Sequence, residues 1–394
     1  MGRRVAIVGA GQTDSRGRHD NLDAPELARQ AMRRALESAD LTPAAIESYV
    51  IGIAPEAFEG VNNPDKWIIG AVGASGKPTY RVHTGGTTGA AAALAAVDLV
   101  ASGQVDLVAV VALQRIGQSP DAQRILNTIW DPIYERDFAL NTIVLASLRS
   151  ARAMQLHGIT EEHWAAVSVR NHANGARNPR AHIRKNVTVE DVMASPMLTW
   201  PIKTLDACPR SEAACAIIVA SEDVAKRMTP TPVWVQGYGS ASDTYYIGDR
   251  LGTLPDSEFL DAAALRKAGA TAYAMAGVTD PVRELDLVEL YAPFTSSETQ
   301  AWEALRFCDP GQAKTLVEED FGSRNSPVVM NPSGGVQCSN PIGATGLVRI
   351  AELFDQLTGT AGDIQVPDAR RGLATAAGGS SQFYSVTIMG LDQP

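Results

Sequence analysis

The segment that decides the fold is APELARQAMRRALESADLTPAAIESYVIGIAPEAF, residues 24–58, because a second segment repeats its pattern. Residues 259–294 read FLDAAALRKAGATAYAMAGVTDPVRELDLVELYAPF. Each segment has helical periodicity first, then a Thr with a Pro close behind, an acidic residue and a buried strand. Each ends with Ala-Pro and Phe. The sequence therefore predicts two similar α/β units.

A second pair of segments repeats in the same order. Residues 82–112, VHTGGTTGAAAALAAVDLVASGQVDLVAVVA, predict a strand, a Gly-Gly loop, a helix and a strand. Residues 328–359, followed by RRGLATAAGG at 370–379, predict the same order with a longer loop. We therefore expect two similar halves, residues 1–228 and 229–394, each with a parallel sheet covered by helices. Two unrelated α/β domains are the alternative.

One long segment, residues 114–200, fits neither half. It contains WDPIYERDF, NHANGARNPRAH and MLTWP, which are polar and aromatic with frequent Asn and Pro. Long insertions of this kind tend to form lids or binding walls. A dimerisation arm is the other interpretation, and the two are compatible.

Composition excludes several classes of function. The chain has 394 residues and a net charge of −10, which argues against nucleic acid or an anionic membrane as the main partner. The four cysteines and six histidines show no zinc spacing, so we expect no metal and no disulfide framework. The apolar run in MGRRVAIVGAGQT is too short for a membrane span or a signal sequence, so we expect a cytoplasmic protein. GAGQTD lacks the third glycine of a dinucleotide fingerprint, so NAD is not expected.

Four motifs resemble the thiolase superfamily, and more narrowly its sterol-carrier-protein-x or lipid-transfer-protein thiolase-like group. They are NPSGGVQCSNPIGATG (331–346), AAGGSSQFYS (376–385), DACPRSEAACAIIVAS (206–221) and LYAPF (290–294). The resemblance implies a five-layer α-β-α-β-α arrangement of two similar halves and a dimer. It also implies coenzyme A as part of a thioester substrate, with no bound cofactor.

The chain departs from the thiolase pattern at each catalytic position. The slot of the nucleophilic Cys falls at Gly86 or Thr87, and the slot of the catalytic His is Asn340. Ala376 or Ala377 stands where the second Cys would be. An amide can donate a hydrogen bond to an oxyanion but cannot act as a base, so covalent acyl transfer is not expected.

Thiolase-like proteins that lack these groups resemble the aldolases of steroid side-chain breakdown, which cleave β-hydroxyacyl-CoA esters to a ketone or aldehyde and a shorter acyl-CoA. The resemblance places a catalytic Tyr at Tyr291, and Asn340 as an oxyanion or substrate contact. His83, at the end of a predicted strand, is a candidate proton relay. The candidate substrate and oxyanion contacts are Gly86, Thr87, Gly335, Gly378 and Gly379. Such aldolases often bind a small OB-fold and zinc-ribbon partner in a heterotetramer.

Some assignments stay open at this point. The aldolases carry a second Tyr in the slot of Asn340, so Tyr134 or His172 from the insertion is a candidate for its role. Cys338 is expected to be buried, although a reactive thiol there would favour a thiolase with a relocated nucleophile. Cys208 and Cys215 are assigned to the core. A third hypothesis is a non-catalytic subunit of a complex that processes acyl-CoA.

Overall fold

The computed structural model describes residues 2–138, 140–250 and 260–393, so the first residue of the second repeat lies outside the described residues. The N-terminal half contains, in chain order, β1 (Val5–Gln12), α1 (Ala24–Ser38), β2 (Ser48–Ile53), α2 (Pro64–Val72), β3 (Thr79–Val82), α3 (Thr88–Ala101), β4 (Leu107–Arg115), β7 (Glu212–Ser221) and α8 (Glu222–Met228). The C-terminal half contains β8 (Val233–Ser242), α9 (Ala263–Ala276), α10 (Pro281–Glu284), β9 (Leu287–Glu289), α11 (Thr295–Ala304), α12 (Ala313–Glu318), β10 (Val329–Met330), α13 (Gly335–Cys338), α14 (Ile342–Leu357), β11 (Arg371–Gly378) and β12 (Phe383–Gly390).

The two halves share one strand order. The N-terminal half is ordered β3-β2-β4-β7-β1, and the C-terminal half is ordered β10-β9-β11-β12-β8. Each strand of one set of five therefore has a counterpart at the same position in the other set, which confirms the predicted duplication. The halves join edge to edge through β1 and β8, where Ala6 pairs with Trp234 and Ile7 with Val233. The expected parallel sheet is only partly right, because β7, β1, β12 and β8 pair antiparallel with their neighbours.

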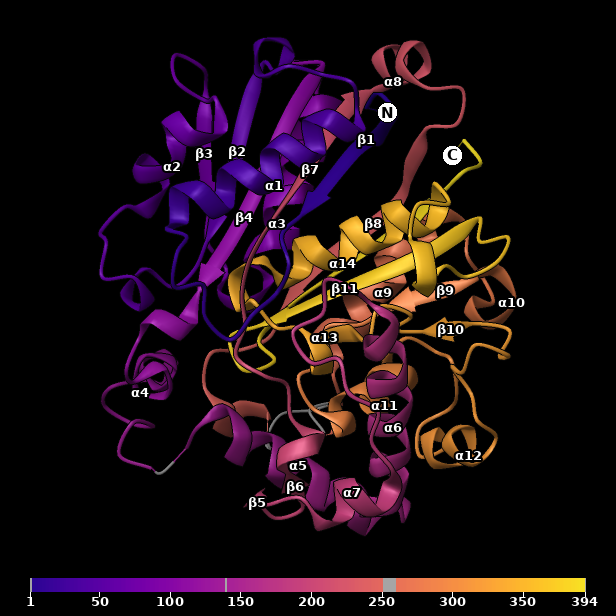
Figure 1. The fold of residues 1–394 in the computed structure, drawn as a ribbon. Helices are drawn as coiled ribbons and strands as arrows, with labels where there is room; N and C mark the ends of the chain where they lie inside the picture. The colour runs from indigo at the N-terminus through magenta and orange to yellow at the C-terminus, as the bar shows by residue number, and fades with distance from the viewer. Residues whose placement is uncertain (1, 139, 251–259, 394) are drawn as a thin grey trace.

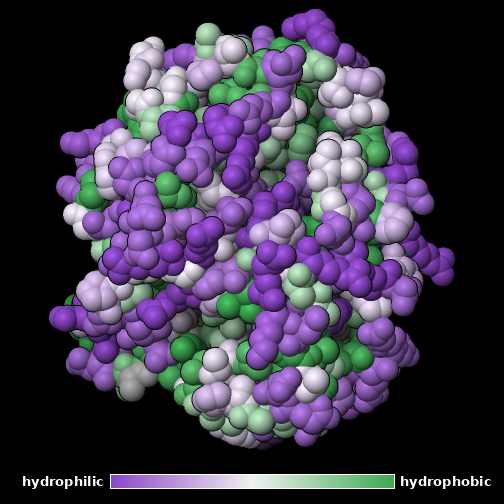
Figure 2. Space-filling model, viewed as in Figure 1, coloured by the Kyte–Doolittle hydropathy of each residue, from purple (hydrophilic) through white to green (hydrophobic). Residues whose placement is uncertain are grey.

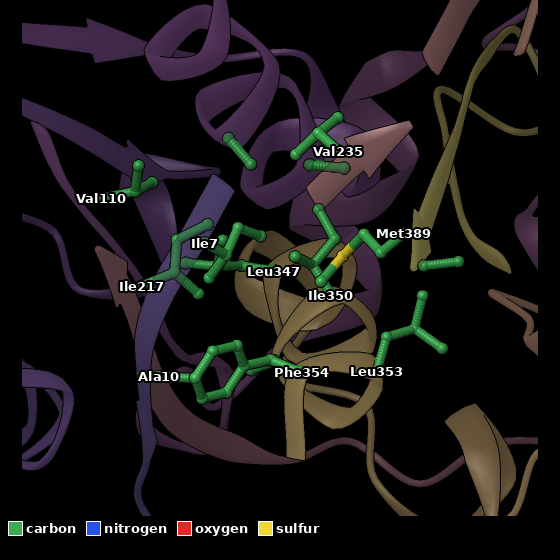
Figure 3. Packing of buried hydrophobic residues seen from close by; sticks show 14 of the residues in the cluster. Ile7, Ala10, Val110, Ile217, Val235, Leu347, Ile350, Leu353, Phe354 and Met389 are labelled. Atoms are coloured by element: carbon green, nitrogen blue, oxygen red, sulfur yellow. The ribbon is translucent and has the colours of Figure 1, made fainter. Parts of the chain in front are cut away.

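The helices and the two sets of strands form five layers in the order α-β-α-β-α (Figure 1). The helix α1 packs on the outer face of the N-terminal strands, and α9 packs on the outer face of the C-terminal strands. The helices α3 and α14 lie between the halves in a shared core. In Figure 3, Leu347 and Ile350 of α14 lie between Ile217 of β7 and Met389 of β12. The thiolase arrangement expected from the motifs is therefore present.

The central helices cross at two glycines. A Cβ on Gly89 of α3 would lie 2.8 Å from the backbone nitrogen of Leu347, and one on Gly346 of α14 would lie 2.9 Å from that of Ala90. A larger residue at either position would push the helices apart. This close crossing brings the start of α3 and the loop before α14 together, and these two segments carry the predicted site.

The segment between β4 and β7 forms a separate group of helices at the bottom of Figure 1. It contains α4 (Ala122–Leu126), α5 (Thr142–His157), α6 (Glu161–Arg177), α7 (Val189–Ala194), β5 (Met197–Thr199) and β6 (Ile202–Lys203). Several large apolar side chains here are exposed, among them Leu148, Met197 and Trp200. Figure 2 shows apolar side chains gathered at this end of the molecule. No helix among the described residues is long and apolar enough to cross a membrane.

Candidate active site

A cavity of about 830 Å³ lies where both halves meet the insertion. Its walls come from the loop after β3, the ends of β9 and β11, the loop before α14, and helices α4, α5 and α11. Most of the lining side chains are apolar, including Ile125, Leu126, Ile143, Leu145, Ala146, Leu198, Leu265, Phe294 and Ile342. Tyr291, Asn340, Cys208 and the glycine loops meet at one place in the cavity, and other polar and charged residues, among them Arg149, Arg210, Glu303 and Lys314, line it elsewhere. Such a cavity suits a ligand with a bulky apolar portion and one reactive polar end.

Tyr291 follows β9 closely, at the carboxyl end of that strand. Its backbone N–H donates to Thr375 Oγ1 at 2.8 Å, which fixes the residue beside β11. Its phenol Oη lies 3.3 Å from Oδ1 of Asn340. Burial raises the pKa of the Tyr291 phenol well above its ordinary value, and the nearby Cys208 raises it further, whereas a hydrogen bond from Thr345 and the charge of Arg349 oppose the shift. Tyr291 is therefore a neutral phenol at physiological pH in the ligand-free cavity.

Asn340 is almost completely buried, at 5% exposure, and its backbone and side chain are both held. Its backbone N–H donates to Ser211 Oγ at 3.1 Å, and its carbonyl accepts from Ser211 N at 3.2 Å. The side-chain Oδ1 accepts from Thr345 Oγ1 at 2.9 Å and from Tyr291, and Nδ2 donates to Cys208 Sγ at 3.0 Å. Both ends of the amide thus have protein partners. In this conformation Asn340 accepts the hydrogen bond of Tyr291 through Oδ1.

The two glycine loops face each other across the base of the cavity. A Cβ on Gly378 would lie 2.7 Å from the backbone nitrogens of both Gly86 and Thr87. A Cβ on Gly86 would clash with the carbonyl oxygen of Ala377 and lie 3.2 Å from Tyr291 Oη. The space that a nucleophilic side chain at position 86 would need is therefore taken by Ala377 and by the Tyr291 hydroxyl.

His83 lies at the rim of the same cavity, after β3, and is largely exposed. Partial burial and the charge of Arg81 lower the pKa of His83, and Glu56 opposes the shift. The imidazole is therefore neutral at physiological pH and able to accept a proton.

Two predicted contacts do not line the cavity. The Thr87 hydroxyl donates to the Thr84 carbonyl at 2.7 Å and so closes its own turn. The Gly335 N–H donates to Ser333 Oγ at 3.1 Å, and a Cβ there would meet the Asn331 side chain. The Thr87 hydroxyl and the Gly335 N–H are thus used within their own turns, and the lining of the cavity does not support either assignment. Gly86, Gly378 and Gly379 do line the cavity.

Tyr134 and His172, the two candidates for a second proton-transfer group, also lie outside the cavity lining. Tyr134 is 66% exposed and packs edge-on against Tyr246, and His172 is buried in α6 with its Nδ1 beside the Ser168 carbonyl at 2.9 Å. Neither residue lines the cavity. Cys338 is buried, as expected, with its Sγ 3.4 Å from the Asn171 carbonyl.

Cys208 is the site residue that sequence analysis missed. It was assigned to the core, whereas it lines the cavity in contact with Asn340. Its backbone N–H donates to the Pro293 carbonyl at 2.9 Å, and Ala207 forms an isolated β-bridge with Phe294. This pairing places Cys208 beside the LYAPF motif that contains Tyr291, although the two segments are far apart in the sequence. No local sequence pattern predicts such a pairing. Burial raises the pKa of the Cys208 thiol to about 11, so it is protonated at neutral pH.

A buried ion pair lies beneath the loop that carries Asn340. Glu289, the last residue of β9, pairs with Arg349 of α14 and accepts from Ser333 N at 2.9 Å and Ser333 Oγ at 2.8 Å. Both charged side chains are almost fully buried. The pair ties β9, the 331–346 loop and α14 together, so it fixes Tyr291 relative to Asn340. No group of His, Cys, Asp and Glu residues in the described ranges could hold a metal ion.

Comparisons with known proteins agree with this arrangement. The chain matches the family "Thiolase, N-terminal domain" over residues 5–195 and "Thiolase C-terminal domain-like" over residues 252–391. It is 31% identical to an acetyl-CoA acetyltransferase of Methanothermobacter thermautotrophicus, over 98% of this chain and 99% of the relative. It is 28% identical to sterol carrier protein 2 of Gallus gallus, over 99% of this chain and 72% of that protein.

Solved structures share the fold. The Ltp2-ChsH2(DUF35) aldolase superposes with a TM-score of 0.83 at 24% identity, covering 99% of this chain and 98% of that one. Human mitochondrial 3-ketoacyl-CoA thiolase superposes with a TM-score of 0.73 at 16% identity, covering 99% of each chain. The strand order, the paired glycine loops and these matches together show that the chain belongs to the thiolase superfamily, among its sterol-carrier-protein thiolase-like members.

Proposed function

We propose that the chain is a carbon–carbon lyase that cleaves a β-hydroxyacyl-CoA by a retro-aldol reaction. The observation that carries the proposal is the position of Tyr291, whose hydroxyl lies 3.2 Å from the point where a Cβ on Gly86 would be. A superfamily site that normally presents a nucleophile there presents a phenol instead. A phenol can exchange a proton with a substrate hydroxyl but is poorly placed to carry an acyl group.

The reaction balances with the groups that line the cavity. In one concerted relay, Tyr291 takes the proton of the substrate β-hydroxyl as the Cα–Cβ bond breaks and passes its own proton toward neutral His83 at the rim. The electrons of that bond form a thioester enolate, and the β-carbon leaves as the carbonyl of a ketone or aldehyde. Protonated His83 then supplies the proton that the enolate α-carbon takes up, which restores both residues.

The enolate oxygen requires hydrogen-bond donors that are in place before the bond breaks. We assign this role to backbone N–H groups of the facing loops at Gly86 and Gly379. Both residues line the cavity, and neither has a side chain to keep the substrate away.

The apolar wall defines the other end of the substrate. A cavity of about 830 Å³ lined by aliphatic side chains fits a large apolar acyl group. A steroid or related side-chain ester is our specific proposal. It is supported by the names of the sterol carrier protein 2 relatives.

The test is direct. The purified chain is incubated with a β-hydroxyacyl-CoA, and the released ketone or aldehyde and the shortened acyl-CoA are quantified by mass spectrometry. Tyr291→Phe is expected to lower turnover by about 10²- to 10⁴-fold, the usual contribution of general acid–base catalysis. Tyr80→Phe, the same change at an exposed residue outside the cavity, serves as the matched control. Full activity of Tyr291→Phe would remove the basis of the proposal.

One observation favours a second candidate, acyl transfer through Cys208. The thiol lines the cavity, and one relative is an acetyl-CoA acetyltransferase. Against it, the thiol pKa is raised to about 11, and the contact that holds its sulfur is an amide N–H rather than a base. Incubation with acyl-CoA followed by peptide mass spectrometry separates the two functions. An acyl adduct on Cys208 supports acyl transfer, and an unmodified Cys208 with product release supports the lyase.

We also propose that the chain works as a homodimer together with a small OB-fold and zinc-ribbon partner. The proposal is supported by the Ltp2-ChsH2(DUF35) structure, which is named for two components. Co-expression with a candidate partner, followed by size-exclusion chromatography with light scattering, measures whether a heterotetramer forms. If the chain elutes without the partner and still has full lyase activity, this assembly is contradicted.

A further inference from the structure

The Asn340 amide is held by three groups that differ in what they can donate and accept. Two of them, Tyr291 Oη and Thr345 Oγ1, face Oδ1 at 3.3 and 2.9 Å. The third, Cys208 Sγ, faces Nδ2 at 3.0 Å. In this arrangement the neutral phenol donates to Oδ1, and Nδ2 donates to sulfur.

The two ends of an amide have nearly the same shape, so a half-turn exchanges Oδ1 and Nδ2 without moving neighbouring atoms. The thiol of Cys208 can accept from Nδ2 or donate to Oδ1, and the hydroxyl of Thr345 can likewise accept or donate. Asn340 therefore keeps a partner at each end in either orientation. A backbone carbonyl or N–H partner would instead permit one orientation only.

The orientation matters to Tyr291. A neutral phenol needs an acceptor, which Oδ1 supplies, whereas a phenolate needs donors. After a half-turn Nδ2 would face the phenolate at the same position, and Thr345, whose hydroxyl also bonds to Tyr291, adds a second donor.

We propose that the Asn340 amide is a two-position switch that follows the protonation state of Tyr291. Cys208 and Thr345 are positioning residues that make both positions stable. The inference rests on the proposed function insofar as Tyr291 must gain and lose a proton in each turnover. It explains why an amide stands in a slot where a proton-transferring side chain would otherwise be found.

The surroundings of Tyr291 contain few other groups that could set its charge state. The Cys208 thiol approaches from the loop before β7, and the Arg349 guanidinium acts from α14, where Glu289 of β9 already pairs with it. His83 lines the same cavity from the N-terminal half. Of these groups, Arg349 favours the phenolate, but Glu289 offsets its charge. The Asn340 amide, together with the Thr345 hydroxyl beside it, can change from hydrogen-bond acceptor to donor toward Tyr291.

The decisive measurement is the pKa of residue 291 without substrate. A fluorinated tyrosine, whose phenol titrates below that of tyrosine, is introduced at position 291 by codon suppression and titrated by ¹⁹F NMR. A fixed amide would offer only Oδ1, so Asn340→Leu would lower the pKa by removing an acceptor for the neutral phenol. A switching amide offers the stronger charge-assisted bond to the phenolate, so Asn340→Leu is expected to raise the pKa by roughly one to two units. A decrease or no change overturns the proposal.

A second measurement needs no variant at position 340 and so does not depend on its folding. In protein carrying the fluorinated tyrosine and ¹⁵N-asparagine, the Nδ2 resonance of Asn340 is followed through the titration. We expect it to move with the ¹⁹F signal, because Nδ2 exchanges a sulfur acceptor for a phenolate. An Nδ2 resonance that stays still while residue 291 ionises overturns the switch. Neither readout uses turnover, so the lyase assay can fail or succeed independently.

Discussion

The carbonyl oxygen of Ala377 occupies the space that a side chain on Gly86 would need. The loop after β3 and the end of β11 therefore pack directly against each other at Gly86, one of the two positions expected to match the thiolase nucleophile. A side chain introduced at position 86 alone would meet the backbone of residue 377.

This contact predicts that Gly86→Cys will not restore acyl transfer. The new side chain must push against a backbone carbonyl, which is expected to destabilise the fold by about 1–3 kcal/mol. The free energy of unfolding from urea titration measures the cost. Gly70→Ala is the control, because a Cβ at Gly70 of α2 meets nothing within 4 Å. A stable Gly86→Cys variant that forms an acyl-enzyme would show that the two loops separate easily.

The duplicated fold could be predicted because its signals are local. Pro25 in the first turn and the apolar spacing of 24–38 define α1, and the repeated pattern in the second half defines α9 and β9. The directions in which strands pair could not be predicted in the same way. The sheet was expected to be parallel, but β1, β7, β8 and β12 pair antiparallel with their neighbours. An apolar run indicates burial without indicating which neighbour the strand will have.

The candidate site was predictable only where a motif carried it. Tyr291, Asn340 and the glycine loops follow from short motifs, and the structure brings them together around one cavity. Cys208 does not, because its place depends on the pairing of residues 207 and 208 with residues 293 and 294. Gly335 is the reverse case. It lies in a matching motif and was expected to contact the substrate, but its N–H donates to Ser333 within its own turn.

The buried pair of Glu289 and Arg349 predicts a large and pH-dependent loss of stability. Arg349→Met leaves a buried carboxylate without its cation, which is expected to cost about 3–5 kcal/mol at pH 8. Burial already raises the pKa of Glu289, and loss of Arg349 raises it further. The folded variant then binds a proton more readily than the unfolded chain between the unfolded pKa, about 4.3, and the raised folded value. Its stability should therefore recover as the pH falls from 8 to 5.

Urea unfolding of Arg349→Met at both pH values measures this recovery. The matched control is the double variant Glu289→Gln with Arg349→Met, in which no carboxylate remains to be buried without a partner. Its penalty should be smaller at pH 8 and nearly independent of pH. Equal penalties for Arg349→Met at the two pH values would contradict the assignment of Glu289 as its charged partner.

The pH dependence of turnover should report His83. Its pKa is lowered, so the neutral imidazole that accepts a proton is present above an inflection that lies below about 6.5, the ordinary value for histidine. We expect kcat/KM to fall as the pH drops through that inflection and to be flat towards pH 8. Because the Tyr291 pKa is raised, no ionisation of that phenol should appear in the neutral range.

His83→Gln is expected to lower kcat/KM by about 10²-fold and to remove the acid inflection. His163→Gln is the control, since His163 lies on α6, pairs with Glu318 and does not line the cavity. An unchanged acid inflection in His83→Gln would assign the proton acceptor to a different group.

The apolar wall predicts chain-length selectivity. Ala146 lies on α5 and lines the cavity, and its methyl group packs with Ile202 and Phe294. Ala146→Phe fills part of the cavity, so the KM of a bulky β-hydroxyacyl-CoA should rise by about tenfold or more, because each excluded methylene group forfeits about 0.8 kcal/mol of burial. A short-chain β-hydroxyacyl-CoA, whose acyl group does not reach α5, should react with an unchanged KM and acts as the internal control. Steady-state kinetics with both substrates give the two constants, and an equal rise for both would mean that the variant disturbs the reactive end rather than the wall.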